Sequence, residues 1–191
     1  MVIFGFDIEI MCKTLSNLAF GNTLKKALMN KILLFAFLII GIGVNGQDLP
    51  TEPENGFAFP IGSKFTIKLH PTDSINFDFS IIKFEPFQEI VDTWENDKLF
   101  EENGEAGTIE FYFCLGTSGE TEAEKEKNMK VLLLIKNRTE FALNYNSDIQ
   151  RTENGEFKET SNIGTFPGAK GNEMWPYMIY QIGLNGFKKM E

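Results

Sequence analysis

From Phe57 onward, apolar residues recur mainly at every second position of the chain. Strict alternation is typical of a β-strand that buries one face and turns the other to solvent. In the run Ile109–Leu115, the intervening residues Glu110, Tyr112 and Cys114 are therefore expected on the solvent side. The four clearest runs are Phe65, Ile67 and Leu69; Ile75, Phe77, Phe79 and Ile81; Ile109, Phe111, Phe113 and Leu115; and Phe141, Leu143 and Tyr145. The pattern predicts an all-β domain.

Two further segments complete the predicted set of strands. Val131–Ile135 is apolar at every position, which indicates a central strand covered on both faces, and a last strand is predicted over Met178–Leu184. Turn signals separate the strands at Asn103-Gly104, Asn154-Gly155, Pro167-Gly168 and Asn185-Gly186. Short strands at this spacing favour an antiparallel β-sandwich, immunoglobulin-like or jelly-roll-like, with at most one or two short helices.

Three local patterns leave alternatives open. Phe87, Ile90, Val91 and Trp94 have the spacing of a helix stripe, with an irregular, bulged strand as the alternative. Residues 119–130 are polar and are expected to form an exposed loop with a single helical turn. A two-residue turn at Asn154-Gly155 is the third pattern. It would place Arg151 diagonally opposite Glu156, and Glu153 diagonally opposite Lys158, in a solvated ribbon.

The segment before this domain has the features of an export signal. Ile32–Val44 is thirteen apolar residues long and follows three lysines, Lys25, Lys26 and Lys31. A basic segment, an apolar run of this length and a short cleavage motif describe a secretory signal peptide. A membrane-spanning helix needs about 20 apolar residues. We therefore expect export, to the periplasm, the cell surface or the medium, with cleavage after Gly46.

The leader also fixes the expected domain boundaries. Residues 1–28 are interpreted as an upstream extension from a misassigned start, 29–46 as the signal peptide, 47–56 as a linker and 57–191 as one β-sandwich domain. If Met1 is the true start, an uncleaved inner-membrane anchor with the domain outside is the alternative, and it is the only membrane contact expected. The leader, ending in Asn45-Gly46 before Gln47, resembles those of exported proteins from Bacteroidetes-type bacteria, as does the Phe-, Asn- and Lys-rich composition. The resemblance implies export and carries no functional residues.

Charge and composition exclude several functions. Acidic residues outnumber basic ones 27 to 18, and without the four basic and two acidic residues of positions 1–46 the net charge is −11. Nucleic acid is therefore excluded as a partner, because phosphate binding needs clustered Lys and Arg. One His and two Cys exclude most zinc sites, and we expect no metal and no cofactor. Calcium ligation by Asp92, Asn96, Asp97 and Glu101 does not match the EF-hand spacing.

No catalytic residue is assigned from the sequence. His70 has nominal triad partners in Ser74 or Ser80 and Asp73 or Asp78, but no Gly-x-Ser-x-Gly motif accompanies them. Cys114 lies in an apolar strand, where a free Cys behaves as a small core residue. A cluster of acids, Glu101, Glu102, Glu105 and Glu110, leaves a carboxylate-dependent, glycosidase-like hydrolase as the alternative function.

The candidate ligand-binding residues are aromatic. Trp175 and Tyr177 flank Pro176, Tyr180 follows, and Trp94 is added as a fourth candidate. Flat rings stack on the apolar faces of sugars or form hot spots for proteins. The competing interpretation is that Trp175 plugs an open end of the sandwich. The sequence therefore predicts an exported, non-catalytic binding or envelope-associated domain, whose partner is a protein or a glycan.

Overall fold

The computed structural model describes residues 49–50 and 52–190. The predicted upstream extension and leader lie outside the described residues. In chain order the elements are β1 (Gly56–Pro60), β2 (Ser63–Pro71), β3 (Asn76–Pro86), β4 (Ile90–Asp92), the 3-10 helix η1 (Asp97–Leu99), β5 (Thr108–Thr117), α3 (Glu122–Lys127), β6 (Lys130–Asn137), β7 (Leu143–Gln150), β8 (Lys158–Thr160), β9 (Lys170–Trp175) and β10 (Gln181–Lys189).

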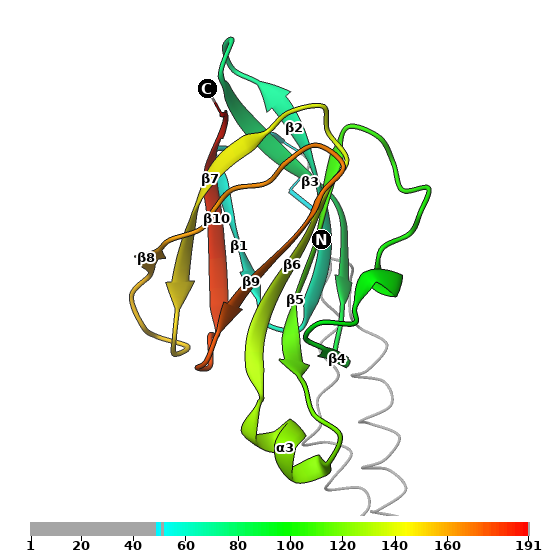
Figure 1. Ribbon diagram of the computed structural model, residues 1–191. Coiled ribbons are helices and arrows are strands. Elements are labelled where there is room, and N and C mark those ends of the chain that lie inside the picture. The colour runs from blue at the N-terminus through cyan, green and yellow to red at the C-terminus, as the bar shows by residue number, and fades with distance from the viewer. Residues whose placement is uncertain (1–48, 51, 191) are drawn as a thin grey trace, which may run out of the picture. The chain divides into compact units, whose positions relative to one another are not determined.

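The strands form one curled sheet (Figure 1). Its order is β8-β7-β10-β3-β2-β5-β6-β9, with β1 on β10 and β4 on β5. The β4–β5 pairing is parallel and the others are antiparallel. The all-β, antiparallel prediction is confirmed. The two layers expected of a sandwich are two halves of this single sheet, so an immunoglobulin-like or jelly-roll arrangement of two sheets does not describe it.

The inner face of the sheet is filled with aromatic side chains. Phe59 stacks on Phe65 with 3.6 Å between ring centroids, and Phe65 stacks on Phe111 at 4.9 Å. Phe79 contacts Phe187 edge to face at 5.1 Å. All five are buried, and complete burial of one such side chain stabilises a fold by about 1.5–3 kcal/mol. The residues predicted to alternate inward from β2, β3, β5 and β7 belong to this core or pack against it, except Ile75, which precedes β3 and is exposed.

The outer face of β5 and β6 is buried as well. Tyr112 and Cys114 of β5 pack with Leu132 and Leu134 of β6 beneath the segment that links β3 to β5, which contributes Val91. The expectation for β6 as a central strand covered on both faces is confirmed. The expectation of a solvent-exposed outer face for β5 is wrong, because a non-local segment covers it.

The helix alternative for Phe87–Trp94 is wrong, and the strand alternative holds. β4 pairs with Leu115–Thr117 of β5. β2 reaches only as far as Phe113 along that edge of β5, so the backbone groups beyond it need another partner, and β4 supplies it. Val91 is buried, whereas Ile90 and Trp94 are exposed, an alternation that a helix stripe would not produce.

The predicted turns have mixed outcomes. Pro167-Gly168 forms a turn in which Ala169 N–H donates to Phe166 O at 3.0 Å, with φ of 68° at Gly168. Asn185-Gly186 lies inside β10, where the register shifts between Asn185 and Lys188 and Gly186 has φ of 63°. The Asn-Gly pair therefore forms a β-bulge in a continuous strand, not a turn.

The polar segment 119–130 contains the short helix expected there. α3 begins with a capping box, in which the Thr121 side chain accepts from Glu124 N–H and the Glu124 carboxylate accepts from Thr121 N–H. Its residues are not buried. Across residues 49–50 and 52–190, no helix has the length and apolar character needed to span a membrane.

Candidate functional site

The four candidate aromatic residues lie at the same end of the sheet, where β5 and β9 end (the lower end in Figure 1). Trp175 ends β9, Tyr177 and Tyr180 lie between β9 and β10, and Trp94 follows β4. The pairing registers bring these positions to one end, because β4 and β5 end there while β6 and β10 begin there. Proximity in the sequence accounts for the shared location of Trp175, Tyr177 and Tyr180 only. Trp94 lies at the same end because β4 pairs with the end of β5.

Their environments differ. Trp175 is 5% exposed and belongs to the core, where its Nε1–H donates to Thr160 Oγ1 at 3.3 Å. Its burial agrees with the interpretation that Trp175 fills the interior at this end of the domain. The hydrogen bond links β9 to β8, the two end strands of the sheet. Trp94 is 63% exposed and lies 5.9 Å from Lys130 Nζ, while Tyr180 is 38% exposed. Of the four, Tyr177 alone lines a cavity described below.

An open cleft of about 390 Å3 lies between the loop joining β7 to β8 and the segment after β9. The strand β8 and the loop that joins it to β7 are at the lower left in Figure 1. We call this cavity the hairpin cleft, and its lining residues are Ile149, Arg151, Thr152, Gly155, Glu156, Lys158, Glu159, Thr160 and Tyr177. Small-ligand sites commonly have volumes of about 300–1,000 Å3. The hairpin cleft is therefore large enough for a ligand of one or two sugar rings.

The loop that shapes this cleft is longer than predicted. Ile149 pairs with Lys158, which leaves residues 151–157 as the connection, so the prediction of a two-residue turn at Asn154-Gly155 is wrong. The Gln150 side chain donates through Nε2 to Gly155 O at 2.7 Å, and Gly155 N–H donates to Thr152 O at 3.0 Å. Burial of Ile149 and the hydrogen bond from the Gln150 side-chain amide fix the register between β7 and β8. The local turn signal does not determine this register.

The expected charge pairs of the predicted ribbon do not form. The Arg151 guanidinium lies over the Tyr177 ring, 4.3 Å from its centroid. Within the described part of the chain, Arg151, Glu156, Lys158 and Glu159 have no ion-pair partner within 4.0 Å. The cleft therefore combines one aromatic ring, two hydroxyl side chains and four charged groups that remain available to a ligand.

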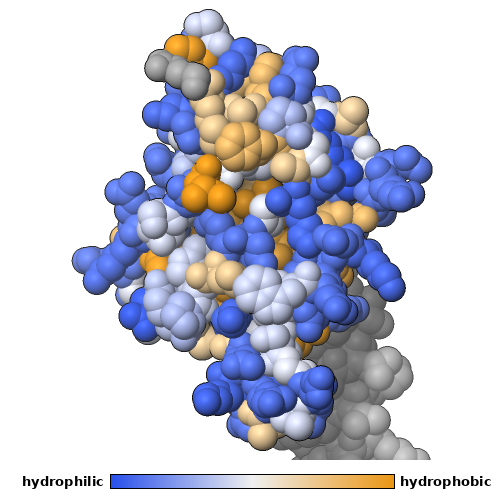
Figure 2. All heavy atoms as spheres, in the orientation of Figure 1, coloured by the Kyte–Doolittle hydropathy of each residue, from blue (hydrophilic) through white to orange (hydrophobic). Residues whose placement is uncertain are grey.

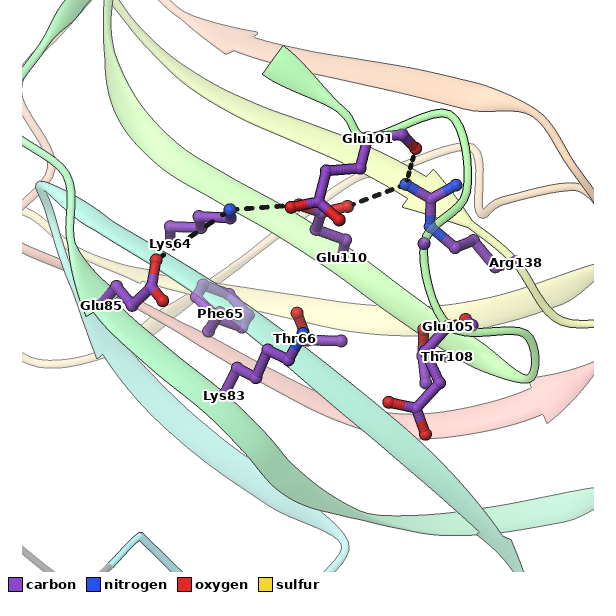
Figure 3. Close-up of a pocket in the computed structure, with 11 residues that line it drawn as sticks. Lys64, Phe65, Thr66, Lys83, Glu85, Glu101, Glu105, Thr108, Glu110 and Arg138 are labelled. Atoms are coloured by element: carbon purple, nitrogen blue, oxygen red, sulfur yellow. Dashed lines mark hydrogen bonds and ion pairs between the residues drawn. The ribbon is translucent and has the colours of Figure 1, made fainter.

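Three of the four acids expected to cluster near residues 101–110 come together away from the hairpin cleft, and Glu102 is not among them (Figure 3). Glu101, Glu105 and Glu110 line a cavity of about 30 Å3 next to Arg138 and Lys64. Arg138 Nη2 lies 3.0 Å from Glu110 Oε2, and Lys64 Nζ lies 3.5 Å from Glu110 Oε1. A volume of this size holds one or two water molecules and no sugar ring.

This ion cluster holds a loop against the sheet. Arg138 also donates to Glu101 O at 2.6 Å, and the Tyr112 hydroxyl donates to Leu99 O at 2.6 Å. The Arg138 and Glu110 side chains are each 9% exposed. Both carboxylate oxygens of Glu110 are engaged by cations, so the group has the contacts of a structural anchor for the loop before β5.

Glu173, which the sequence patterns did not indicate, is a half-buried acid with one buried carboxylate oxygen. Glu173 of β9 shares the inward face with Trp175, accepts a hydrogen bond from the Tyr145 hydroxyl of β7, and has Oε2 buried without a hydrogen-bond partner. Burial raises the pKa of Glu173 to about 7, against a smaller lowering by the Tyr145 hydrogen bond. Burial and the neighbouring carboxylate also raise the pKa of Tyr145. The period-two spacing of Glu173 and Trp175 is the signal that could have placed this acid inside.

The structure also locates the residues considered for nucleophilic catalysis. His70 Nε2 lies 2.9 Å from Ser80 Oγ across β2 and β3, while Asp78, opposite His70 in the register, makes no hydrogen bond or ion pair with it among the described contacts. Neither cavity includes this pair. Cys114 is buried, and burial raises the pKa of its thiol to about 12, which keeps it protonated. Within residues 52–190, no group of three His, Cys, Asp or Glu side chains is arranged to hold a metal ion.

The face drawn in Figure 2 is mostly hydrophilic, and its apolar side chains form small, separated groups. Recognition through a mixed cleft fits such a surface better than recognition through a broad apolar patch. Comparison of the chain with known protein families, with curated proteins and with solved structures found no match. The function is therefore argued from the site itself.

Proposed function

We propose that this protein is an exported, non-catalytic binding module whose ligand site is the hairpin cleft, and that the ligand is a glycan. The observation that carries the proposal is the cleft of about 390 Å3 with the Tyr177 ring in its wall. Tyr177 is half-buried and carries Arg151 over its ring; the exposed part of the ring supplies apolar contact for a sugar, and its hydroxyl supplies a hydrogen bond. Thr152 and Thr160 add hydroxyl groups that bond to sugar hydroxyls.

Two observations favour binding over chemistry. The groups normally used for nucleophilic catalysis, His70, Ser80 and Cys114, lie outside the hairpin cleft. The acids gathered around Arg138 enclose room for water only. A well-packed core with an open cleft on its surface suits a domain that recognises a ligand and leaves it unchanged.

Glycan-array binding of the wild-type domain and of two variants tests this proposal. We expect Tyr177→Ala to lower the affinity for the strongest wild-type ligand at least tenfold, because the ring forms part of the cleft wall. Trp94→Ala is the matched control, since it removes a larger exposed aromatic at the same end of the sheet outside the cleft. Its affinity should stay within twofold. Equal affinity of wild type and Tyr177→Ala, or no wild-type binding, contradicts the proposal.

The hydrolase alternative now concerns Glu156 and Glu159, the two carboxylates that line the cleft. A glycosidase needs two carboxyl groups on opposite sides of the scissile bond. Prolonged incubation of the bound glycan with the protein should leave its length unchanged by mass spectrometry. Release of shorter products, abolished in Glu156→Gln or Glu159→Gln, would replace the binding proposal with the enzyme.

Export is the second part of the proposal, and the leader pattern at Ile32–Val44 supports it. N-terminal sequencing of the protein from cell fractions distinguishes the two localisations. A product that begins at Gln47 in the periplasm, on the cell surface or in the medium is the expected result. Retention of residues 1–46 in the membrane fraction would favour the inner-membrane anchor.

A further inference from the structure

The two arginines of this chain have opposite environments. Arg138 and Arg151 are the only ones in the sequence. Arg138 is nearly buried, pairs with the Glu110 carboxylate at 3.0 Å and donates to a backbone carbonyl. Arg151 is exposed, and within residues 52–190 it has no carboxylate within 4.0 Å. Two acids, Glu153 and Glu156, lie close to Arg151 in the sequence, so the absence of an ion pair at Arg151 results from the fold.

The Tyr177 ring holds the Arg151 guanidinium in place of an acid. The 4.3 Å separation between Cζ and the ring centroid is the distance of a stacking cation–π contact, which arginine makes through its planar face. Within the described part of the chain, the guanidinium N–H groups of Arg151 have no hydrogen-bond or ion-pair partner besides this ring, so they are free for a ligand. Those N–H groups match the two oxygens of a carboxylate as a bidentate pair.

We infer that Arg151 is the anchor for a carboxylate on the ligand, so that the hairpin cleft takes a saccharide carrying a uronic acid residue. This inference rests on the proposed glycan-binding function. The cleft lining supports one carboxylate and disfavours a dense polyanion, because its two cations, Arg151 and Lys158, are balanced by Glu156 and Glu159. The Thr152 hydroxyl, together with the Thr160 hydroxyl as a donor beyond its acceptor bond from Trp175, is left for the sugar hydroxyls.

Calorimetric titration of the full-length protein with a matched pair of sugars tests the inference. The probes are an oligosaccharide containing one glucuronic acid residue and its carboxyl-reduced counterpart, which has a primary alcohol instead. We expect the acid form to bind at least tenfold more tightly. Binding of the acid form should also weaken as salt increases, since the contact is between charges near the surface.

Variants assign the preference to Arg151. Arg151→Gln should bind the acid and reduced sugars with equal affinity, and Arg151→Lys should retain only part of the preference because an ammonium cannot form the bidentate pair. Lys188→Gln, which removes an exposed cation of β10 outside the cleft, should keep the wild-type preference. Unchanged thermal unfolding would show that each variant is folded.

The outcomes separate the inference from the function on which it rests. Equal binding of the two sugars by wild type, with loss of both in Tyr177→Ala, overturns the carboxylate anchor and leaves the glycan site standing. Binding of neither probe, while neutral array glycans bind through Tyr177, has the same meaning. Absence of binding to these probes and to every array glycan overturns both.

Discussion

At the scale of single residues, the molecule places its buried charges in two different ways. Glu110 is surrounded by Arg138 and Lys64, so ionisation is matched by opposite charge. Glu173 has only the Tyr145 hydroxyl on one oxygen, and its other oxygen is buried without a partner. A carboxylate in such a place is costly, and burial therefore raises the pKa of Glu173 to about 7.

Glu173 should make folding stability depend on pH. Its pKa rises from 4.5 in the unfolded chain to about 7 in the fold because of burial, so the folded state binds more protons between these values. The contribution is fully present below pH 4.5 and is lost as pH rises through 7. Between pH 5 and pH 8 we expect a loss of about 2–3 kcal/mol.

Urea unfolding at pH 5 and pH 8 measures this effect. Glu173→Gln keeps an acceptor for Tyr145 and removes the titration, so its stability should change less with pH than that of wild type. Because the comparison is between the two proteins, contributions from other titrating groups cancel. The same pH dependence in both proteins would show that Glu173 titrates normally in the fold.

The stability of the domain should be sensitive to the loss of one partner of the Arg138–Glu110 pair. Arg138→Met leaves the nearly buried Glu110 carboxylate with Lys64 alone, and we expect a loss of about 3 kcal/mol in the free energy of unfolding. Adding Glu110→Leu should recover part of that loss, because no unpaired charge then remains. Chemical denaturation of the single and double variants decides the matter, and a double variant less stable than Arg138→Met would argue against it.

At the scale of elements, local rules succeed where one strand and its own side chains decide the outcome. The alternation in β2, β3, β5 and β7 places their inward residues correctly, and the all-apolar β6 is central as predicted. The rules fail where a distant segment supplies the partner. The outer face of β5 is buried by Val91 and its neighbours, and β4 is a strand because the edge of β5 is free beyond β2.

The Asn185-Gly186 pair shows why a turn signal alone is insufficient. Positive φ suits a hairpin turn and a bulge equally, and the long antiparallel pairing with β7 on either side of it selects the bulge. The same limit applies to the hairpin cleft. Its register depends on burial of Ile149 and on the Gln150 amide, and neither is visible in the Asn154-Gly155 motif.

The bulge predicts a sharp difference between two glycines of β10. Gly186→Ala should destabilise the domain by about 1–2 kcal/mol, because φ of 63° is unfavourable for any L side chain and its Cβ would lie 2.9 Å from Asn146 Nδ2. Gly183→Ala is the control, since its Cβ would make only ordinary contacts at 3.6 Å or more. Thermal unfolding of both variants gives the comparison, and equal losses would refute the role assigned to the bulge.

At the scale of the whole molecule, the curled sheet is closed by side chains. Tyr145–Glu173 and Thr160–Trp175 link β7 and β8, at one end of the sheet, to β9 at the other. The proposed ligand site lies outside the aromatic core. The aromatic content of the site could be predicted from Trp175 and Tyr177, but the stacking of Arg151 on Tyr177 could not. That contact joins two loops 26 positions apart, and the pairing of β7 with β10, in which Gln150 lies opposite Gln181, brings them together.

A residue-by-residue map of the ligand contact tests the central claim, that the hairpin cleft is the binding site. In a 15N–1H NMR titration of the domain with its strongest array glycan, we predict the largest amide shifts at residues 149–160 and at Tyr177. Amides of the loop over β5, residues 87–107, should stay in place. Saturable shifts concentrated in 87–107, with residues 149–160 unmoved, would contradict the account and put the ligand on the other side of the sheet.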